Sequence, residues 1–373
     1  MYMKISELKL LIDKWAPPGV AWDRDNPGLQ VGDPTDQVSG ILLAFDATSE
    51  AVKYAKAKKY NLIITHHPLL FHSVKNINTS RPGIPSVLKS AIKNDITVLS
   101  YHTNLDFTSG GVSFALAEKL GLKKIQFLEP VASKRNKLVV FVPADSVEKI
   151  ADAVFNVGGG VIGAYRNCSF SSKGTGTFFG EDNSNPVLGE KGQIENVEEV
   201  RLEILFNEWD REAVLRSIYQ NHPYEQPAVD IYKLENLHEN FGSGAIGELE
   251  NEISEKDFLQ LVAKRLNVPA LRHNALNGKK VKKVALCGGA GEEYYKRAIT
   301  LGADAYVTAD IRYHNFIDSA GSILLVDAGH YETEAHILEN LKIRIEDLIT
   351  GKNIPVEIYS ENANPVFYYI NEE

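Results

Sequence analysis

Short, nearly continuous apolar runs recur through the first third of this chain, and they restrict its fold more than any other feature. Three of them are GILLAF (40–45), NLIIT (61–65) and ITVLSY (96–101). Between them, residues 49–59 and 85–94 have the apolar spacing of amphipathic helices. Strands that are apolar on both sides need cover on both faces, which is typical of a parallel sheet flanked by helices. The sequence therefore predicts an α/β fold.

The middle of the chain has a different pattern, which predicts a second domain. Strand-like runs at 137–143 and 197–207 are each followed by a helical segment, in a βαβ-βαβ order of the ferredoxin-like kind. Glycines crowd residues 158–180, where we expect tight turns and close packing. Residues 129–136 and 236–244 are expected to be the linkers that bound this region.

The α/β pattern then returns in the last part of the chain. Further strands are expected at 281–287, 304–308, 322–327 and 355–360. At 373 residues the chain exceeds a typical single core. We therefore predict a discontinuous α/β domain of residues 1–127 and 241–373, with residues 128–240 inserted into it as an α+β domain.

An internal similarity favours this split. The segment that starts at Gly40 aligns without a gap on the one that starts at Lys283, and both have the order strand, loop, helix, strand. Glu50 matches Glu293, and Thr65 matches Thr308. Any two βαβ units share such a pattern, so chance similarity is the alternative. We predict a genuine repeat, which would place the two outer segments around a pseudo-two-fold axis.

Composition excludes several classes of protein. No apolar run approaches the ~20 residues that span a bilayer, and the N-terminus lacks the features of a secretory signal. Cys168 and Cys287 lie too far apart in sequence for a zinc clip or a redox pair, which predicts a reducing, cytoplasmic location. The net charge of −9 argues against an outer surface that binds nucleic acid.

Three polar clusters each follow a predicted strand. They are ITHHPLLFH (64–72), YHTNLD (101–106) and DAGHYETE (327–334). In open α/β sheets, ligands bind at the carboxyl ends of the strands. Taken singly, each cluster has an ordinary structural explanation: a core histidine, a turn aspartate or a solvated helix residue.

Taken together, the clusters predict a metal centre. His66, His67, Asp106, His330 and Glu334 form the mixed nitrogen and carboxylate set that binds Zn, Mn or Fe. Carboxylates also bridge metal pairs about 3.5–4 Å apart, which activate water in hydrolytic enzymes. We therefore predict two divalent metal ions per chain, bound by these five residues.

Other polar residues are candidates for supporting roles. His102 follows a strand and is either a group that supports the ligands or a buried strand-end histidine. In the proposed repeat, Asp310 aligns with His67, and His314 follows the corresponding strand. Asp310 and His314 are therefore candidates to line the cleft.

The same motifs carry a family resemblance. WDRDNPGLQVGD (22–33), ITHHPLLFH, YHTNLD, TADIRYH (308–314) and DAGHYETE resemble the Nif-three-like family, whose members are often called type-two GTP cyclohydrolase I homologues. The resemblance covers both outer segments in order. It implies a two-lobed α/β fold with a dinuclear metal site between the lobes, commonly assembled as a hexamer.

The resemblance also bears on particular residues. It implies the same five ligands, with Glu334 and Asp106 as candidate bridges between the metals. The middle region resembles the PII-like domain inserted in longer members, including HPYEQPAVDIY (222–232). This chain has Asn-Pro-Gly at residues 26–28, where many members have Asn-Val-Gly, and that change affects no ligand.

Two functions remain open at this point. The first is a metal-dependent hydrolase; the resemblance suggests GTP as its substrate, with opening of the guanine imidazole ring and release of formate. The second is a non-enzymatic, metal-containing regulatory or scaffold assembly that senses a ligand through the inserted domain. Turnover of nucleotides by the metal-loaded protein would separate them.

Overall fold

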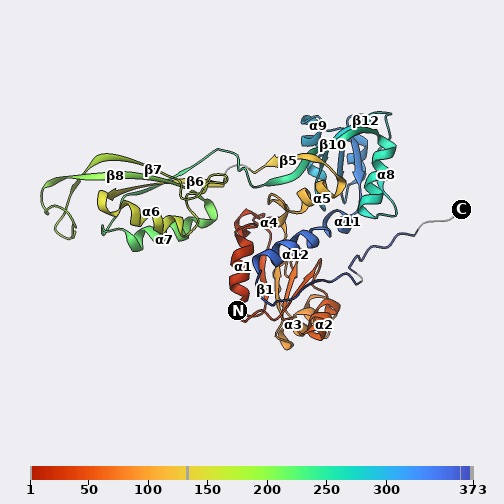
Figure 1. The fold of residues 1–373 in the computed structure, drawn as a ribbon, viewed down its shortest axis with the longest axis horizontal. Helices are drawn as coiled ribbons and strands as arrows, with labels where there is room; N and C mark the ends of the chain where they lie inside the picture. The colour runs from red at the N-terminus through yellow and green to blue at the C-terminus, as the bar shows by residue number, and fades with distance from the viewer. Residues whose placement is uncertain (1, 132–133, 362, 370–373) are drawn as a thin grey trace. The chain divides into compact units, whose positions relative to one another are not determined.

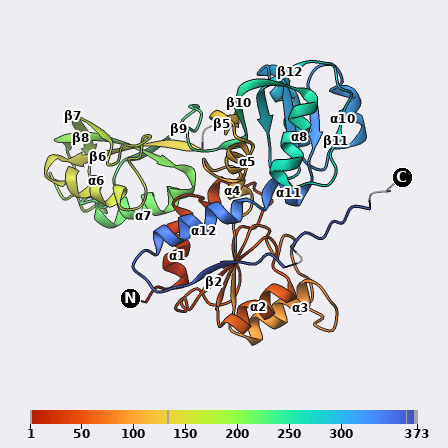
Figure 2. The same cartoon turned by 45° about the vertical axis from the view of Figure 1, so that its right-hand side comes forward.

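The chain folds into two compact units, described here from a computed structural model that covers residues 2–131, 134–361 and 363–369. Unit 1 comprises Met1–Glu129 and Phe241–Glu373, and unit 2 comprises Pro130–Asn240. Figures 1 and 2 show the secondary-structure elements of each unit. In the described part of the chain, no helix is long and apolar enough to cross a membrane.

The first sheet of unit 1 has five strands in the order β1-β4-β3-β2-β15. Its members are β1 (Gly28–Val31), β2 (Ile41–Ala44), β3 (Leu62–Thr65), β4 (Thr97–Ser100) and β15 (Val356–Ile358). All adjacent pairs are parallel except β1 and β4, which are antiparallel. The residues of β2, β3 and β4 are all buried, as their unbroken apolar sequences predict.

Helices cover both faces of this sheet. Residues Ile41 and Leu43 of β2 pack with α1 (Ile5–Asp13) and α12 (Ile337–Leu348). Leu42 and Ala44 point the other way, and they pack with α2 (Ser49–Lys58) and α3 (Ile84–Lys93). The resulting three layers, with α1 and α12 on one side and α2 and α3 on the other, are visible in Figure 2.

The second sheet of unit 1 has six strands in the order β11-β14-β13-β12-β10-β5. They are β5 (Lys123–Pro130), β10 (Gly242–Ser254), β11 (Arg272–His273), β12 (Lys280–Leu286), β13 (Ala305–Thr308) and β14 (Leu324–Asp327). The central strands β12, β13 and β14 are parallel, and β10 and β11 join them antiparallel. The packing helices are α8 (Glu255–Leu266), α9 (Tyr295–Thr300) and α10 (Tyr313–Asp318).

Helix α5 (Val112–Leu120) connects the two sheets of unit 1. Val112 and Ala115 belong to the core of the first sheet, whereas Leu116 and Leu120 belong to the core of the second. One helix therefore packs into both cores, which fixes the ends of the two sheets relative to each other. This arrangement places α11 (His330–Glu334) between the sheets in both ribbon views (Figures 1 and 2).

Unit 2 is a four-stranded antiparallel sheet in the order β7-β8-β6-β9. Its elements are β6 (Arg135–Pro143), α6 (Val147–Phe155), β7 (Ser169–Phe179), β8 (Ile194–Asn207), α7 (Arg211–Asn221) and β9 (Val229–Lys233). This βαββαβ order is that of ferredoxin-like folds. Residues of α6 and α7 pack on one face of the sheet in a core separate from those of unit 1.

Two predictions about this region need correction. In the glycine-rich stretch at 158–180, the expected tight turns and close packing occur at 158–163, where Gly158 and Gly160 have positive φ and a Cβ at Gly159 would lie 2.5 Å from Val154. Residues 169–179 instead form β7, an exposed edge strand. The expected linkers are also shorter than predicted. Residues 129–130 end β5, residues 135–136 begin β6, and residues 242–244 begin β10, whereas 132 and 133 lie outside the described residues.

The remaining short helices connect these elements. They are η1 (Pro18–Val20), α4 (Thr103–Asp106), η2 (Ala144–Ser146), η3 (Glu208–Asp210) and η4 (Glu292–Tyr294).

Candidate metal centre

The carboxyl ends of three parallel strands bring the predicted ligands together within unit 1. His66 and His67 directly follow β3, and Asp106 ends α4, the short helix after β4. His330 and Glu334 are the first and last residues of α11, which follows β14. Because they are four residues apart on one helical turn, their side chains face the same way.

Glu334 lies at the centre of this cluster. Its Oε2 atom is 3.6 Å from His66 Nε2, 3.5 Å from His67 Nε2 and 3.1 Å from His330 Nε2. Asp106 Oδ1 is 3.7 Å from the same nitrogen of His66. Two groups of potential ligand atoms result: His67, His330 and Glu334 form one, and His66, Asp106 and Glu334 form the other.

Three atoms of the cluster are buried without a hydrogen-bond partner in the described part of the chain. They are His66 Nε2, Asp106 Oδ1 and Glu334 Oε2. Burying a polar atom without a hydrogen-bond partner costs about 1–3 kcal/mol. Three such atoms in one cluster therefore need an explanation. A cation that accepts electron pairs from nitrogen and carboxylate oxygen provides one, and these residues therefore fit a divalent metal ion.

Each histidine of the cluster is held through its other ring nitrogen. His66 Nδ1 is 2.9 Å from the Tyr101 carbonyl oxygen, and His67 Nδ1 is 2.9 Å from Asp46 Oδ1. His330 Nδ1 is 2.6 Å from Asp310 Oδ2. When Nδ1 donates its proton to these acceptors, Nε2 carries the free electron pair and points into the cluster, as in most protein metal sites.

His102 is a fourth histidine of the cluster and lies beside His66 and His67. Its Nδ1 is 2.9 Å from Asp25 Oδ1, and Thr103 donates to the same carboxylate through its backbone amide and its hydroxyl. His102, His66 and His67 form a third group of potential ligands. Burial raises the pKa of Asp25, but its bonds with His102 and Thr103 outweigh burial and lower it to about 2.

A glycine loop after β12 lies directly against Glu334. Gly289 has φ +60°, and a Cβ atom at this position would lie 2.0 Å from Glu334 Oε1. The backbone amide of Gly289 donates to the Thr333 hydroxyl at 3.0 Å. Only a residue without a side chain allows this close approach, so Gly289 lets the loop contact the Glu334 carboxylate directly.

Charges within the cluster compensate one another. Burial lowers the pKa of His67 and His330, but hydrogen bonds to Asp46 and Asp310, and then the nearby Glu334 carboxylate, outweigh it and raise these pKa values to about 9 and 10. Burial raises the pKa of Glu334, yet the surrounding histidines hold it well below its usual value. Burial and the charge of Glu334 raise the pKa of Asp106. A metal that binds these atoms must displace protons, so binding is coupled to pH.

The structure thus brings all five predicted ligands into one cluster, and two of the three supporting candidates touch it. Asp310 bonds to His330, and His102 lies beside His66 and His67. His314 does not join them: it is exposed on α10 and belongs to none of the ligand groups. Sequence reasoning missed Asp25 and Asp46; the position of Asp46 directly after a buried strand was the only signal for it.

Fold and site together define the class: an α/β protein with two mixed sheets, in which the ends of parallel strands bring together a largely buried histidine and carboxylate cluster suited to metal. Comparisons with known proteins identify the family. The profile of the Duf34/NIF3 (NGG1p interacting factor 3) family matches residues 3–365. The chain therefore belongs to the Duf34/NIF3 family, as its motifs indicated.

Relatives match over nearly the whole chain. The GTP cyclohydrolase 1 type 2 homologs of Bacillus subtilis and Halalkalibacterium halodurans are 36% and 35% identical to it. Both alignments cover 95% of this chain, and 96% and 95% of the respective relatives. The crystal structure of a Bacillus cereus protein related to NIF3 superposes with a TM-score of 0.82 at 35% identity, over 98% of this chain and 99% of that one.

Proposed function

We propose that unit 1 holds two divalent metal ions, with Glu334 shared between them. The observation that carries this proposal is the position of Glu334 Oε2, which belongs to both a His67–His330 group and a His66–Asp106 group. A single tetrahedral ion takes four ligands at most, whereas five candidate ligand side chains converge here. Asp106 is the second candidate bridge, and the nitrogen and oxygen donors suit Zn, Mn or Fe.

We further propose that the centre serves a hydrolytic reaction. When bound, the metal ions polarise a substrate oxygen and make water a stronger acid. The protein contributes the fixed orientation of the donors, since Tyr101, Asp46 and Asp310 each hold one imidazole by its Nδ1 atom. His102 is the candidate for proton transfer, because Asp25 holds its Nδ1 and leaves Nε2 free to accept a proton from the reacting group.

The names of the relatives support a nucleotide as the first substrate to test. We propose the GTP cyclohydrolase type of reaction, in which the guanine imidazole ring opens and formate leaves. The test is a screen of nucleotides and other metabolites with metal-loaded protein, with formate release as one readout. Turnover that disappears in Glu334→Gln and persists in Glu332→Gln would support the proposal; absence of turnover with every substrate would contradict it.

A second candidate function is a metal-containing regulatory or scaffold assembly. The existence of unit 2, with its own core and its own cavity, favours it. In this proposal unit 2 is a PII-like domain that senses a ligand, and the chain assembles as a hexamer. Molecular mass in solution tests the assembly, and metal-loaded protein that turns over no substrate but binds a ligand at unit 2 would support regulation.

We also propose that the two sheets of unit 1 descend from a repeat. The strand pair β2–β3 aligns Ile41 with Leu62, and the pair β12–β13 aligns Val284 with Ala305. These are the positions that the gapless alignment of the two segments equates. A repeat of this kind explains why strand ends from both sheets contribute to one site.

A further inference from the structure

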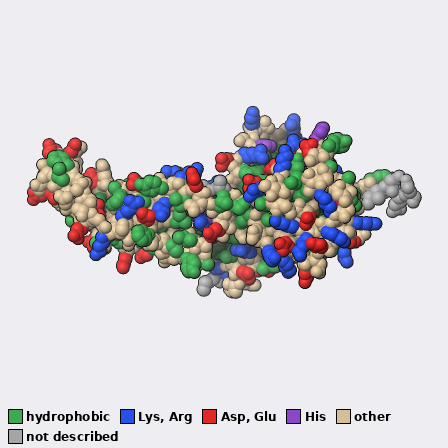
Figure 3. Space-filling model, turned by 90° about the horizontal axis from the view of Figure 1, so that it is seen from above, with side chains coloured by type: hydrophobic (Ala, Val, Ile, Leu, Met, Phe, Trp, Pro, Cys, Tyr) green, Lys and Arg blue, Asp and Glu red, His purple; other side chains and the backbone are tan. Residues whose placement is uncertain are grey.

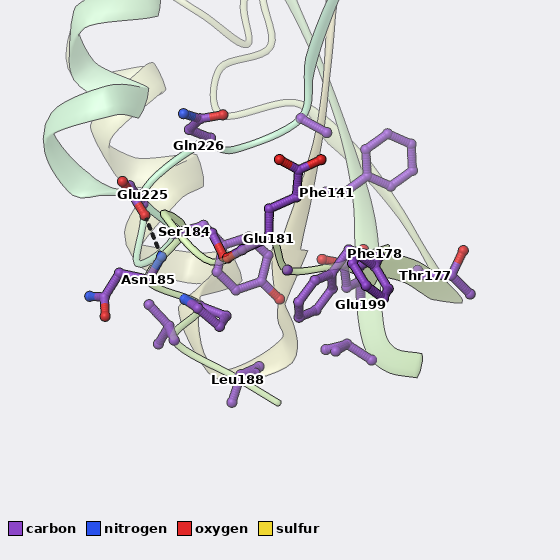
Figure 4. Close-up of a pocket in the computed structure, with 18 of the residues that line it drawn as sticks. Phe141, Thr177, Phe178, Glu181, Ser184, Asn185, Leu188, Glu199, Glu225 and Gln226 are labelled. Atoms are coloured by element: carbon purple, nitrogen blue, oxygen red, sulfur yellow. Dashed lines mark hydrogen bonds between the residues drawn. The ribbon is translucent and has the colours of Figure 1, made fainter. Parts of the chain in front are cut away.

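Unit 2 contains a cavity of about 610 Å³ that the proposed metal chemistry does not use (Figure 4). Its walls come from four parts of the unit: the ends of β7 and β8, the loop 180–188, the segment 224–228 after α7, and Phe141 of β6. Cavities of about 300–1,000 Å³ with mixed apolar and polar walls are typical of small-molecule sites. The size alone therefore makes this cavity a candidate binding site.

The cavity lies on the face of the sheet that the helices leave open. Val140 and Val142 of β6 pack in the core with α6 and α7, so Phe141 between them points to the opposite face and lines the cavity. Glu199 of β8 pairs with Gly174 of β7, and its side chain reaches Gly176, where a Cβ atom would be only 2.1 Å from Glu199 Oε2. The glycine thus makes room for a carboxylate in the cavity wall.

The lining is acidic. Glu181, Glu199 and Glu225 line it, and the lining residues include no Lys, Arg or His. None of the three carboxylates has an ion-pair partner among the described residues; Glu225 accepts a hydrogen bond from the Asn185 backbone amide at 3.0 Å. Residues 176–199 contain six acidic residues and one Lys. Red side chains accordingly gather at this end of unit 2, at the left of Figure 3.

Aromatic side chains provide another part of the wall. Phe141, Phe178 and Tyr224 line the cavity beside the carboxylates. The Tyr224 hydroxyl is buried and has no hydrogen-bond partner in the described residues. Burial, and then the neighbouring Glu199 carboxylate, raises the pKa of Tyr224 to about 12, so the hydroxyl keeps its proton at neutral pH. Aromatic faces attract cations, and carboxylates beside them strengthen that attraction.

The geometry argues against a bare metal ion as the occupant. In the described part of the chain, every group of side chains whose ligand atoms lie close enough to hold a metal belongs to the centre in unit 1. The carboxylates of this cavity are instead spread around a space far larger than an ion. A bulkier cation, with an apolar part that covers the aromatic rings, fits both the charge and the volume.

We propose that the cavity of unit 2 binds a small organic cation, an amine or guanidinium group carried on an apolar body. The cationic group would lie between Glu199 and the aromatic rings, and the apolar part would contact Phe141 and Phe178. The residues of this site belong to unit 2 and are not candidate metal ligands. The proposal is therefore independent of the proposed hydrolase function.

The test is calorimetric titration of the full-length, metal-loaded protein with probes of matched shape and opposite charge. Tryptamine and indole-3-propionate share an indole ring and differ in the sign of the charge; agmatine supplies a guanidinium. We expect at least one of the two cations to bind once per chain, with at least about tenfold higher affinity than indole-3-propionate. No cation binding below about 1 mM, or equal binding of the anion, would overturn the proposal.

Variants locate the site. Glu199→Gln should weaken cation binding about tenfold or more, because it removes one charge-assisted contact while keeping the shape. Glu198→Gln is the matched control: Glu198 is the exposed neighbour on β8 and points to the other side of the strand. Tyr224→Phe provides a second variant should Glu199→Gln lower the melting temperature. Equal weakening by Glu198→Gln, or no weakening by either cavity variant, would contradict the assignment.

Discussion

Single residues outside the set of candidate ligands hold the imidazoles of the cluster in place. Asp310 is more than half exposed, yet its carboxylate bonds to His330 Nδ1 at 2.6 Å. Such a partner fixes which ring nitrogen faces the metal and makes it a better donor. We therefore expect the residues that hold the imidazoles to contribute to metal affinity, although they are not candidate ligands themselves.

Asp310→Asn tests this role. The amide keeps the size of the side chain but accepts a weaker bond from His330, so we expect metal affinity to fall about 10–100-fold with the fold intact. Affinity is measured by competition with a metal-binding dye. Asp318→Asn is the control, since Asp318 is exposed on α10. An unchanged affinity in Asp310→Asn would show that the bond has no effect on binding.

His238 of unit 2 makes stability depend on pH. Burial, with a smaller effect of the Arg135 charge, lowers the pKa of His238 from 6.5 to about 4. Between these values the unfolded chain binds this proton and the folded chain does not, so the free energy of unfolding falls as the pH drops from 6.5 to 4. His238→Asn should reduce this dependence in thermal melts at pH 7 and pH 5; an equally steep dependence would contradict it.

The convergence of the five candidate ligands could be predicted from sequence because each follows a strand that is easily recognised. His66 and His67 come after an unbroken apolar run, and Glu334 lies one helical turn after His330. Asp25 could not be found this way. It precedes β1, a four-residue strand that alternates in burial, and it meets His102 only through the tertiary fold.

At the scale of elements, the loops that follow the strands position the candidate ligands. The loop that follows β12 brings Gly289 against Glu334, and α11 begins directly after Gly329. These loops could not be predicted to meet, because nothing in the sequence shows that residues 289 and 334 are neighbours. The strands with unbroken apolar runs, such as β2, β3 and β4, were predictable. The strand β7 was not, since its glycines and serines lack an apolar pattern, and neither were β1, β5, β10 and β11.

Gly289→Ala tests the loop. Its φ of +60° costs an alanine about 1 kcal/mol, and the new methyl group would also meet Glu334 Oε1. We expect a lower melting temperature and a loss of metal. Gly302→Ala is a matched control, because Gly302 has φ +70° and nothing within 4 Å of its Cβ position. Gly302→Ala should lower the melting temperature and leave the metal content unchanged. Equal metal content in the two variants would contradict our account of the loop.

At the scale of the whole molecule, each unit has its own hydrophobic core. The ends of unit 1 that flank unit 2 also lie side by side, since β5 and β10 are adjacent strands and a Cβ at Gly242 would be 2.8 Å from the Glu129 carbonyl oxygen. A short linker could therefore join Glu129 to Phe241.

Deleting residues 130–240 with such a linker should leave a protein that melts cooperatively and binds metal as the full chain does. The reason is that all five candidate ligands and the helices that support them belong to unit 1. Calorimetric melting and elemental analysis measure the two properties. Loss of the cooperative transition would show that unit 1 depends on unit 2 for its fold.

The central claim is that Glu334 is shared by two metal ions, and metal stoichiometry tests it most directly. Glu334→Gln keeps the volume of the side chain and removes the charge that offsets two dications. The control is Glu332→Gln, since Glu332 bonds to Asn364 and belongs to none of the ligand groups. Elemental analysis after metal-replete purification should find about two transition metals per chain in the parent and in Glu332→Gln, and fewer in Glu334→Gln with the fold retained. Equal metal content in all three proteins, or only trace metal in the parent, would contradict the account.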